Sequence, residues 1–188
     1  MTANIAVFIS GSGTNLQAII DKVQARELDV NLRLVVSDKL NAYGLVRAHD
    51  AGIETVVQEK VKGESRSEYD ARLLGTLIGY DLDLIVLSGF MRILTPEFVN
   101  HYAGKIINIH PSLLPKYPGL DTHRRAIEAG DKEHGTTVHF VTAELDAGPI
   151  IAQSRLQIQA GDDEESLKKR VQELEYDLYW RVISELVG

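Results

Sequence analysis

The sequence contains no cysteine. This absence excludes disulfide bonds, thiolate nucleophiles and cysteine-ligated zinc, so packing and hydrogen bonding alone must stabilise the core. Long apolar runs are missing as well, and no stretch reaches the length that crosses a bilayer. The first five residues lack the basic region and apolar core of a secretory leader. We therefore expect a cytoplasmic enzyme or binding protein with no membrane partner.

An excess of positive charge is also missing. The 20 lysines and arginines stand against 27 aspartates and glutamates, a formal net charge of −7 at pH 7. Proteins that bind nucleic-acid backbones rely on clustered positive charge, so we expect no nucleic-acid partner. A small anionic ligand is still compatible with this composition, because a local cluster of donors is enough to capture it. The length of 188 residues fits one domain spanning 1–188.

Strand-like and helix-like segments alternate along the chain. Short β-branched apolar runs predict strands, and apolar residues recurring at helical spacing predict helices. Strands are predicted at residues 5–10, 32–37, 54–57, 83–88, 105–109, 136–141 and 150–156. Helices are predicted around residues 16–23, 43–51, 65–77, 123–129 and 166–186. The alternation indicates an α/β fold, a doubly wound and mostly parallel sheet flanked by helices.

Residues 106–119 are the most informative segment. Side chains alternate faces along a strand, so Asn108 and His110 should project to the same side. An amide donor beside an imidazole suits an oxyanion that develops during acyl transfer. Pro111 and Pro115 prevent the strand from continuing and predict a shaped loop. Taken alone, an Asn-x-His pair beside an apolar strand is more often structural than catalytic.

A glycine-rich segment at residues 10–15, Ser-Gly-Ser-Gly-Thr-Asn, follows the first predicted strand and opens the first helix. Backbone N–H groups at such a helix start bind anions, and a phosphate monoester fits there. A turn that needs glycine for its geometry alone remains the alternative. Leu16 replaces the third glycine of a dinucleotide fingerprint and no Gly-Lys-Ser/Thr follows, so nicotinamide and nucleoside-triphosphate cofactors are disfavoured.

Two further side chains follow predicted strands. Asp146 lies in the long loop 142–149, and loops at the carboxyl ends of parallel strands surround the ligand crevice, so we expect Asp146 to orient His110 and favour its charged form. The alternative is a turn aspartate preceding Gly148. Arg92 follows another strand and is either a carboxylate ligand or a solvated arginine.

Other polar residues carry weaker signals. His134 and His139 match no closed metal site, so no metal is expected, and His139 is interpreted as a packed, hydrogen-bonded strand residue. Ser112 has no base at a recognisable spacing, which disfavours a serine hydrolase. Charged residues at 164–170 are interpreted as a solvated helix face with helical charge pairs.

Four segments together, residues 9–17, 89–94, 108–119 and 134–149, resemble the folate-dependent phosphoribosylglycinamide formyltransferases, also called glycinamide ribonucleotide transformylases. The similarity runs through the whole chain in the family's order. It implies a Rossmann-like formyltransferase fold and formyl transfer from 10-formyltetrahydrofolate to the amine of glycinamide ribonucleotide, in de novo purine synthesis. It also implies a ribonucleotide phosphate site in the N-terminal half, a folate site in the C-terminal half, and a monomer or homodimer.

The resemblance further implies roles for individual residues. The catalytic residues would be Asn108, His110 and Asp146. The ribonucleotide would be held by Gly13, Thr14, Asn15, Gln172 and Glu175. The folate would be bound by Arg66, Met91, Arg92, Ile93, Leu94, Asn108, Val141 and Asp146. Asp121 departs from the pattern, because some relatives carry histidine there.

Three rival functions remain open at this stage. A formyltetrahydrofolate hydrolase shares the Asn-x-His segment but would lack the phosphate site. A methionyl-tRNA formyltransferase would be expected to carry an additional basic domain. A non-catalytic sensor of folate or nucleotide would keep the pocket without turnover, because retained side chains do not establish catalytic geometry.

Overall fold

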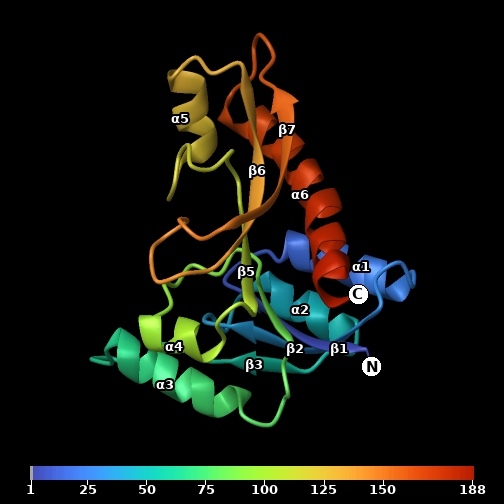
Figure 1. The fold of residues 1–188 in the computed structure, drawn as a ribbon, viewed down its shortest axis with the longest axis vertical. Coiled ribbons are helices and arrows are strands. Elements are labelled where there is room, and N and C mark those ends of the chain that lie inside the picture. Colours follow the sequence, from blue (N-terminus) through green and yellow to red (C-terminus); the bar gives the residue numbers. More distant parts are fainter. Residues whose placement is uncertain (1) are drawn as a thin grey trace.

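A seven-stranded sheet in the order β3-β2-β1-β4-β5-β6-β7 forms the centre of the computed structural model, which describes residues 2–188 (Figure 1). Its strands are β1 (Ala3–Ile9), β2 (Val30–Ser37), β3 (Thr55–Val57), β4 (Leu84–Leu87), β5 (Ile106–His110), β6 (Glu133–Phe140) and β7 (Ile150–Gln157). The strands from β3 to β5 pair in parallel, whereas β6 is antiparallel to both of its neighbours. The predicted mostly parallel α/β sheet is thereby confirmed.

Within residues 2–188, five helices lie between successive strands and a sixth follows β7. They are α1 (Thr14–Gln24), α2 (Tyr43–Asp50), α3 (Arg66–Leu77), α4 (Pro96–His101), α5 (Thr122–Glu128) and α6 (Glu164–Val187). A capping box between Ser65 and Glu68 begins α3. Helix α4 was not predicted. It has six residues, too few to show an apolar repeat, and it begins at a Thr95 cap followed by Pro96.

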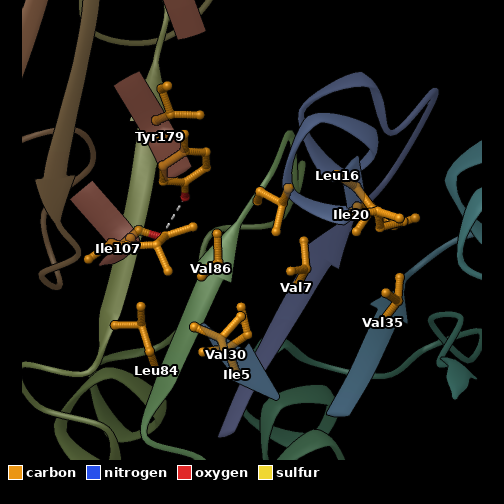
Figure 2. Close-up of a cluster of buried hydrophobic side chains, with 14 of the residues drawn as sticks. Ile5, Val7, Leu16, Ile20, Val30, Val35, Leu84, Val86, Ile107 and Tyr179 are labelled. Atoms are coloured by element: carbon orange, nitrogen blue, oxygen red, sulfur yellow. Dashed lines mark hydrogen bonds between the residues drawn. The ribbon is translucent and has the colours of Figure 1, made fainter. Parts of the chain in front are cut away.

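Two apolar cores cover the two faces of the sheet. Alternate residues of β1 divide between them: Ile5 and Val7 pack toward α1 and α6, while Phe8 packs toward α3 and α4. Figure 2 shows the first core, in which side chains of β1, β2, β4 and β5 meet α1 and α6. Because both faces are buried, the central strands read as nearly continuous apolar runs.

Tyr179 anchors the long helix α6 to the strand edge where the site lies. Its side chain is fully buried, and its hydroxyl donates to the Leu87 carbonyl at 2.7 Å, at the end of β4. Burial raises the pKa of Tyr179 well above its ordinary value, so the hydroxyl keeps its proton and remains a donor. This contact fixes the part of α6 that faces the candidate site.

None of the helices within residues 2–188 combines the length and the apolar character needed to cross a membrane.

Candidate active site

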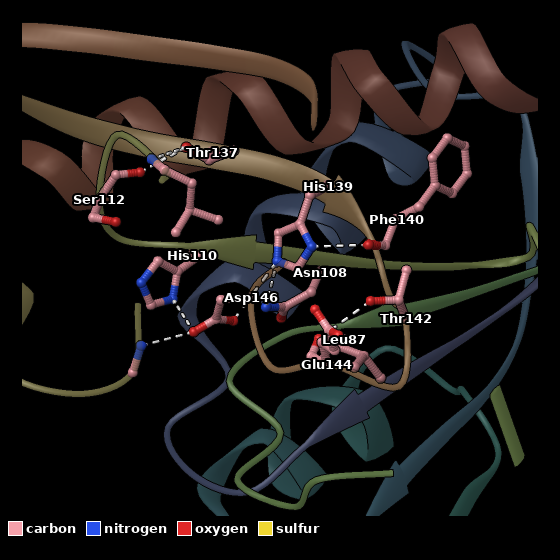
Figure 3. Close-up of polar contacts among 12 residues, drawn as sticks. Leu87, Asn108, His110, Ser112, Thr137, His139, Phe140, Thr142, Glu144 and Asp146 are labelled. Atoms are coloured by element: carbon pink, nitrogen blue, oxygen red, sulfur yellow. Dashed lines mark hydrogen bonds and ion pairs between the residues drawn. The ribbon is translucent and has the colours of Figure 1, made fainter. Parts of the chain in front are cut away.

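The end of β5 delivers two polar side chains to one side of the sheet. Ile107 and Ile109 pack into the core beneath α1 and α6. Asn108 and His110 alternate with them and therefore point to the opposite side, where Figure 3 shows them beside Asp146. His110 is only 6% exposed, so its ring is held in place by its contacts.

Asp146 joins these residues from a distant loop. Its Oδ2 lies 3.4 Å from Nδ1 of His110, and its Oδ1 lies 3.8 Å from Nε2 of His139 (Figure 3). The same Oδ2 accepts a hydrogen bond of 2.8 Å from the Gly119 backbone N–H. The backbone of Asp146 adopts φ 51°, a left-handed conformation that is unfavourable for residues other than glycine. The surrounding contacts must offset this strain.

The route by which Asp146 reaches the site differs from the expectation. The sequence argument placed Asp146 at the carboxyl end of a parallel strand, but β6 is antiparallel to β5. Phe140, at the end of β6, pairs with Ile107 rather than with the last residue of β5. The loop that follows must therefore turn back across β5 to place Asp146 near His110. The reasoning from parallel strand ends was wrong for this strand.

The loop between β5 and α5 completes the surroundings of His110. Nε2 of His110 lies 2.8 Å from the Tyr117 carbonyl oxygen. Ser112 shapes this loop by donating its hydroxyl to the Lys116 carbonyl at 2.6 Å. His110 thus faces a carboxylate at one ring nitrogen and a carbonyl at the other. When both ring nitrogens carry hydrogen, the ring can donate to both of these acceptors.

His139 is the residue that the sequence argument failed to connect to the site. As expected it is packed and hydrogen-bonded, but in addition the β5–β6 register places it directly opposite Asn108. Burial lowers the pKa of His139, so the ring is neutral at pH 7. Its Nδ1 lies 2.9 Å from the Phe140 carbonyl and must carry the proton. Nε2 then accepts from Nδ2 of Asn108 at 3.2 Å, which orients the amide.

The glycine-rich loop forms the opposite wall of the cavity. Gly13 caps α1 with φ 68°, and the first turn of α1 contains no acidic residue. A Cβ atom at Gly13 would lie 2.6 Å from the backbone Cα of Gly44 in α2. Arg47 of α2 donates from Nε to the Ser12 carbonyl at 2.8 Å. The loop is therefore pressed against α2, with the N–H groups at the start of α1 available to an anion.

Glu175 of α6 is hydrogen-bonded to this loop. Its Oε2 accepts from Nδ2 of Asn15 at 2.8 Å, and its side chain is buried. Burial raises the pKa of Glu175 to about 7, an effect that the Asn15 hydrogen bond and the Lys168 charge partly oppose. A carboxyl group that takes up a proton near neutral pH thus lies at the anion end of the cavity.

Glu175→Gln is expected to increase the free energy of unfolding at pH 8 by about 1 to 3 kcal/mol and to change it little at pH 4. The folded pKa of about 7 exceeds the reference value of 4.5. Below pH 4.5 the folded and unfolded states are both protonated and no penalty exists. Stability is lost as pH rises from 4.5 to 7, and the neutral amide avoids this loss. Urea unfolding at both pH values measures the difference.

The matched control for this prediction is Glu173→Gln, because Glu173 is an exposed residue of the same helix. A gain at pH 8 no larger than that of the control would contradict the assignment of a buried, proton-binding Glu175.

Arg92 and its neighbours line the side of the cavity next to α3. The Arg92 guanidinium stacks on the Tyr69 ring at 3.6 Å from the ring centroid, and its Nε is buried without a hydrogen-bond partner. Met91 and Ile93 are exposed at the cavity edge, whereas Leu94 is buried. This wall offers apolar contact together with an oriented cation.

These walls enclose a cavity of about 930 Å³. Every residue assigned to the site from the sequence lines it except Arg66, which is exposed in the first turn of α3. The lining residues among them are Gly13, Thr14, Asn15, Met91, Arg92, Ile93, Leu94, Asn108, His110, Val141, Asp146, Gln172 and Glu175. Their roles, and that of Arg66, stay predictions.

Three residues to which the sequence argument gave no part in the site also line the cavity. Glu164 and Lys168 are exposed, as expected of a solvated helix face, and they line the cavity as well. Asp121 also lines it, with φ 57°, and binds Arg124 at 2.6 Å. The charge pattern of α6 does not predict which of its exposed residues line the cavity, because this depends on which face of the helix packs on the sheet.

His123 and His134 form a buried pair, and His123 also lines the cavity. Nδ1 of His123 lies 3.1 Å from Nε2 of His134, and burial lowers the pKa of each to about 4. Both rings are therefore neutral at pH 7. His134, considered from the sequence as a metal ligand, instead has another histidine as its partner.

The chain is similar to known formyl transferases in sequence and in structure. Residues 3–183 match the family model described as formyl transferase. The chain is 54% identical over 181 residues to phosphoribosylglycinamide formyltransferase of Escherichia coli, covering 96% of this chain and 85% of the relative. Identity to the Haemophilus influenzae enzyme of the same name is 50% over 179 residues, covering 95% of this chain and 84% of the relative.

Solved structures agree with the sequence comparison. The phosphoribosylglycinamide formyltransferase of Coxiella burnetii superposes with a TM-score of 0.95 at 50% identity, covering 100% of this chain and 88% of that one. The Brucella melitensis protein of the same name superposes with the same TM-score at 40% identity, covering 100% and 97%.

Proposed function

The chain belongs to the formyl transferase family, and from this premise we propose that it transfers the formyl group of 10-formyltetrahydrofolate to the amine of N1-(5-phospho-D-ribosyl)glycinamide. The products are the N-formyl ribonucleotide and tetrahydrofolate, in de novo purine biosynthesis. The relatives named above carry phosphoribosylglycinamide formyltransferase as their name. The observation that carries the proposal is one cavity with Asn108, His110 and Asp146 on one wall and an anion-binding loop on another.

The glycine-rich loop and α6 are proposed to hold the ribonucleotide. Backbone N–H groups at Gly13, Thr14 and Asn15 open α1 toward the cavity, which suits the phosphate. Gln172 and Glu175 face the same space from α6. Gln172 supplies a neutral donor and acceptor, and Glu175 supplies acceptor oxygens for hydroxyl groups.

The wall near α3 is proposed to hold the folate. Met91, Ile93, Leu94 and Val141 give apolar surface for an aromatic ring system, and all of them line the cavity. The buried, unpartnered Nε of Arg92 fits a ligand acceptor, and a folate carries carboxylates that a guanidinium binds well. Arg66 is exposed on α3, so its proposed contact would have to reach beyond the cavity lining. The bound folate supplies the formyl group and nothing else is required of it.

Asn108 and His110 are proposed to stabilise the negative charge that amine attack places on the formyl oxygen. The Asn108 amide has two N–H groups. One donates to His139, and we propose that the other donates to the formyl oxygen. The His110 Nε2–H bonds to the neutral Tyr117 carbonyl. An oxyanion is a stronger acceptor than a carbonyl and competes for this donor as its charge develops. Stabilisation is therefore greatest in the transition state.

Asp146 is proposed to hold His110 in its charged form and to accept, through water, the proton that the attacking amine loses. Its Oδ2 faces His110 and the Gly119 N–H, whereas its Oδ1 lies 3.8 Å from Nε2 of His139, beyond hydrogen-bond distance. No covalent bond to the protein is needed, because the nucleophile is the substrate amine.

The direct test mixes the purified protein with 10-formyltetrahydrofolate and glycinamide ribonucleotide and follows the ribonucleotide by mass spectrometry. We expect a mass gain of one formyl group in place of hydrogen, together with tetrahydrofolate. Release of formate without formylated ribonucleotide would instead indicate a hydrolase. Saturable binding of both ligands with no product would indicate a sensor.

The same proposal covers the partners, the cellular location and the oligomeric state of the enzyme. Small molecules are its substrates, and we propose a single formyltransferase domain acting in the cytoplasm as a monomer or homodimer. Nucleic acid has no part in the proposed reaction.

A further inference from the structure

Lys168 lies on the face of α6 that lines the ribonucleotide end of the cavity. Residues 168, 172 and 175 are four and seven positions apart, so Lys168 shares one helix face with Gln172 and Glu175. All three line the cavity. Glu175 is in turn hydrogen-bonded to Asn15 of the glycine-rich loop. Lys168 is thus one to two helical turns from a residue that contacts the loop.

The neighbouring basic residues form ion pairs within α6 and the segment before it, whereas Lys168 forms none within residues 2–188. Lys169 binds Glu165 at 2.9 Å, and Arg170 binds Asp162 at 2.6 Å. Within residues 2–188 Lys168 forms no ion pair, even though Glu164 lies one turn before it on the cavity wall. Its ammonium group therefore needs no protein partner to be displaced before it binds an anion.

The charge balance at this end of the cavity calls for a cation. A phosphate monoester carries about −1.5 to −2 charges at pH 7, and a helix start supplies only about half a positive charge. Arg92 and Lys168 are the lysine and arginine residues that line the cavity within 2–188. Arg92 is stacked on Tyr69 of α3, on the opposite face of the sheet from α6.

The positive charge of Lys168 influences the pKa of two other cavity residues, Glu175 and His123. Burial raises the pKa of Glu175 and lowers that of His123, and the Lys168 charge lowers both. Lys168 is itself exposed, so its long side chain is free to move toward a ligand.

We propose that Lys168 binds the phosphate of the ribonucleotide directly, opposite the backbone donors of residues 11–15, and makes the site selective for phosphorylated substrates. This inference rests on the proposed function, since it adds a contact to the proposed ribonucleotide site. It assigns to Lys168 recognition of the phosphate and no part in the chemistry at the formyl group.

Lys168→Gln is expected to weaken the binding of glycinamide ribonucleotide about tenfold, the loss typical of one charge-assisted contact. Calorimetric titration of the purified protein measures this binding, and steady-state kinetics should show the change in KM rather than in kcat. Lys168→Arg keeps the charge and should recover most of the affinity. Lys169→Gln, one residue further along α6, is the matched control. Glycinamide riboside, which lacks the phosphate, should not distinguish Lys168→Gln from the unmodified protein.

The outcomes separate this inference from the function on which it rests. If the unmodified protein forms formylated ribonucleotide but Lys168→Gln binds the ribonucleotide as tightly as Lys169→Gln, the role of Lys168 is wrong and the proposed function stands. Equal loss of affinity for the riboside would also overturn the role, because it would show a contact outside the phosphate. If the unmodified protein binds no ribonucleotide, both proposals fail.

Discussion

His110→Ala is expected to lower kcat for formyl transfer by about 100- to 1000-fold, the usual loss when one oxyanion donor is removed. In the proposed mechanism the side chain contributes both a donor and a positive charge, and its two nitrogens face Asp146 and the Tyr117 carbonyl. Both contributions grow in the transition state, so kcat should fall more than KM rises. Single-turnover measurements with saturating folate and ribonucleotide isolate the chemical step.

The control for this variant is His49→Ala, since the His49 side chain is 87% exposed on α2. Thermal unfolding and substrate titration show whether His110→Ala still folds and binds. Turnover within threefold of the control in a folded protein would remove His110 from the chemistry. His110→Asn gives a second, more polar replacement should alanine destabilise the buried position.

Asp146→Asn is expected to reduce kcat roughly 1000-fold, within the range that general acid–base groups contribute. Asparagine is close in shape, and its carbonyl oxygen retains the hydrogen bond from Gly119. It lacks the negative charge that favours an imidazolium at His110, and it is a far weaker proton acceptor. The variant should therefore bind both substrates and fail mainly in turnover.

Asp131→Asn is the matched control for Asp146→Asn, because it removes a carboxylate outside the cavity. Asp131 binds Lys116 and Tyr117 on the neighbouring loop and does not line the cavity. Formate added to Asp146→Asn offers a small carboxylate that is expected to restore part of the rate. An Asp146→Asn protein that turns over as fast as Asp131→Asn would show that this acid only shapes the loop.

The architecture was largely predictable because each strand carries its own signal. Runs such as residues 84–87 are buried on both faces and therefore apolar throughout, which marks them in the sequence. Ser65 and Glu68 likewise marked the start of α3 through a local interaction. Helix α4 escaped prediction because its six residues are too few for a repeat. Local signals identify elements, and short elements carry few of them.

The site was predictable where it depends on local geometry and unpredictable where it depends on pairing. Asn108 and His110 share a face because they are two apart in one strand. The contact between Asn108 and His139 requires the antiparallel register of β5 and β6, which no local pattern specifies. Asp146 was placed near His110 by an argument that the direction of β6 contradicts. Lys168 resembled a solvated residue because charge pattern alone does not tell which side of α6 faces a cavity.

If Asn108 acts as proposed, its pairing with His139 makes the alignment of two strands a determinant of rate as well as of folding. A slip of β6 by one residue would turn His139 to the far side of the sheet and present Val138 to the amide. A bulge in the β6–β7 ladder lies between Val138 and His139, at the position where such a slip would have to be absorbed. Insertions or deletions in the turn before β6 should therefore be screened by turnover as well as by thermal unfolding, because a slip would move Val138 out of the core and His139 away from the amide.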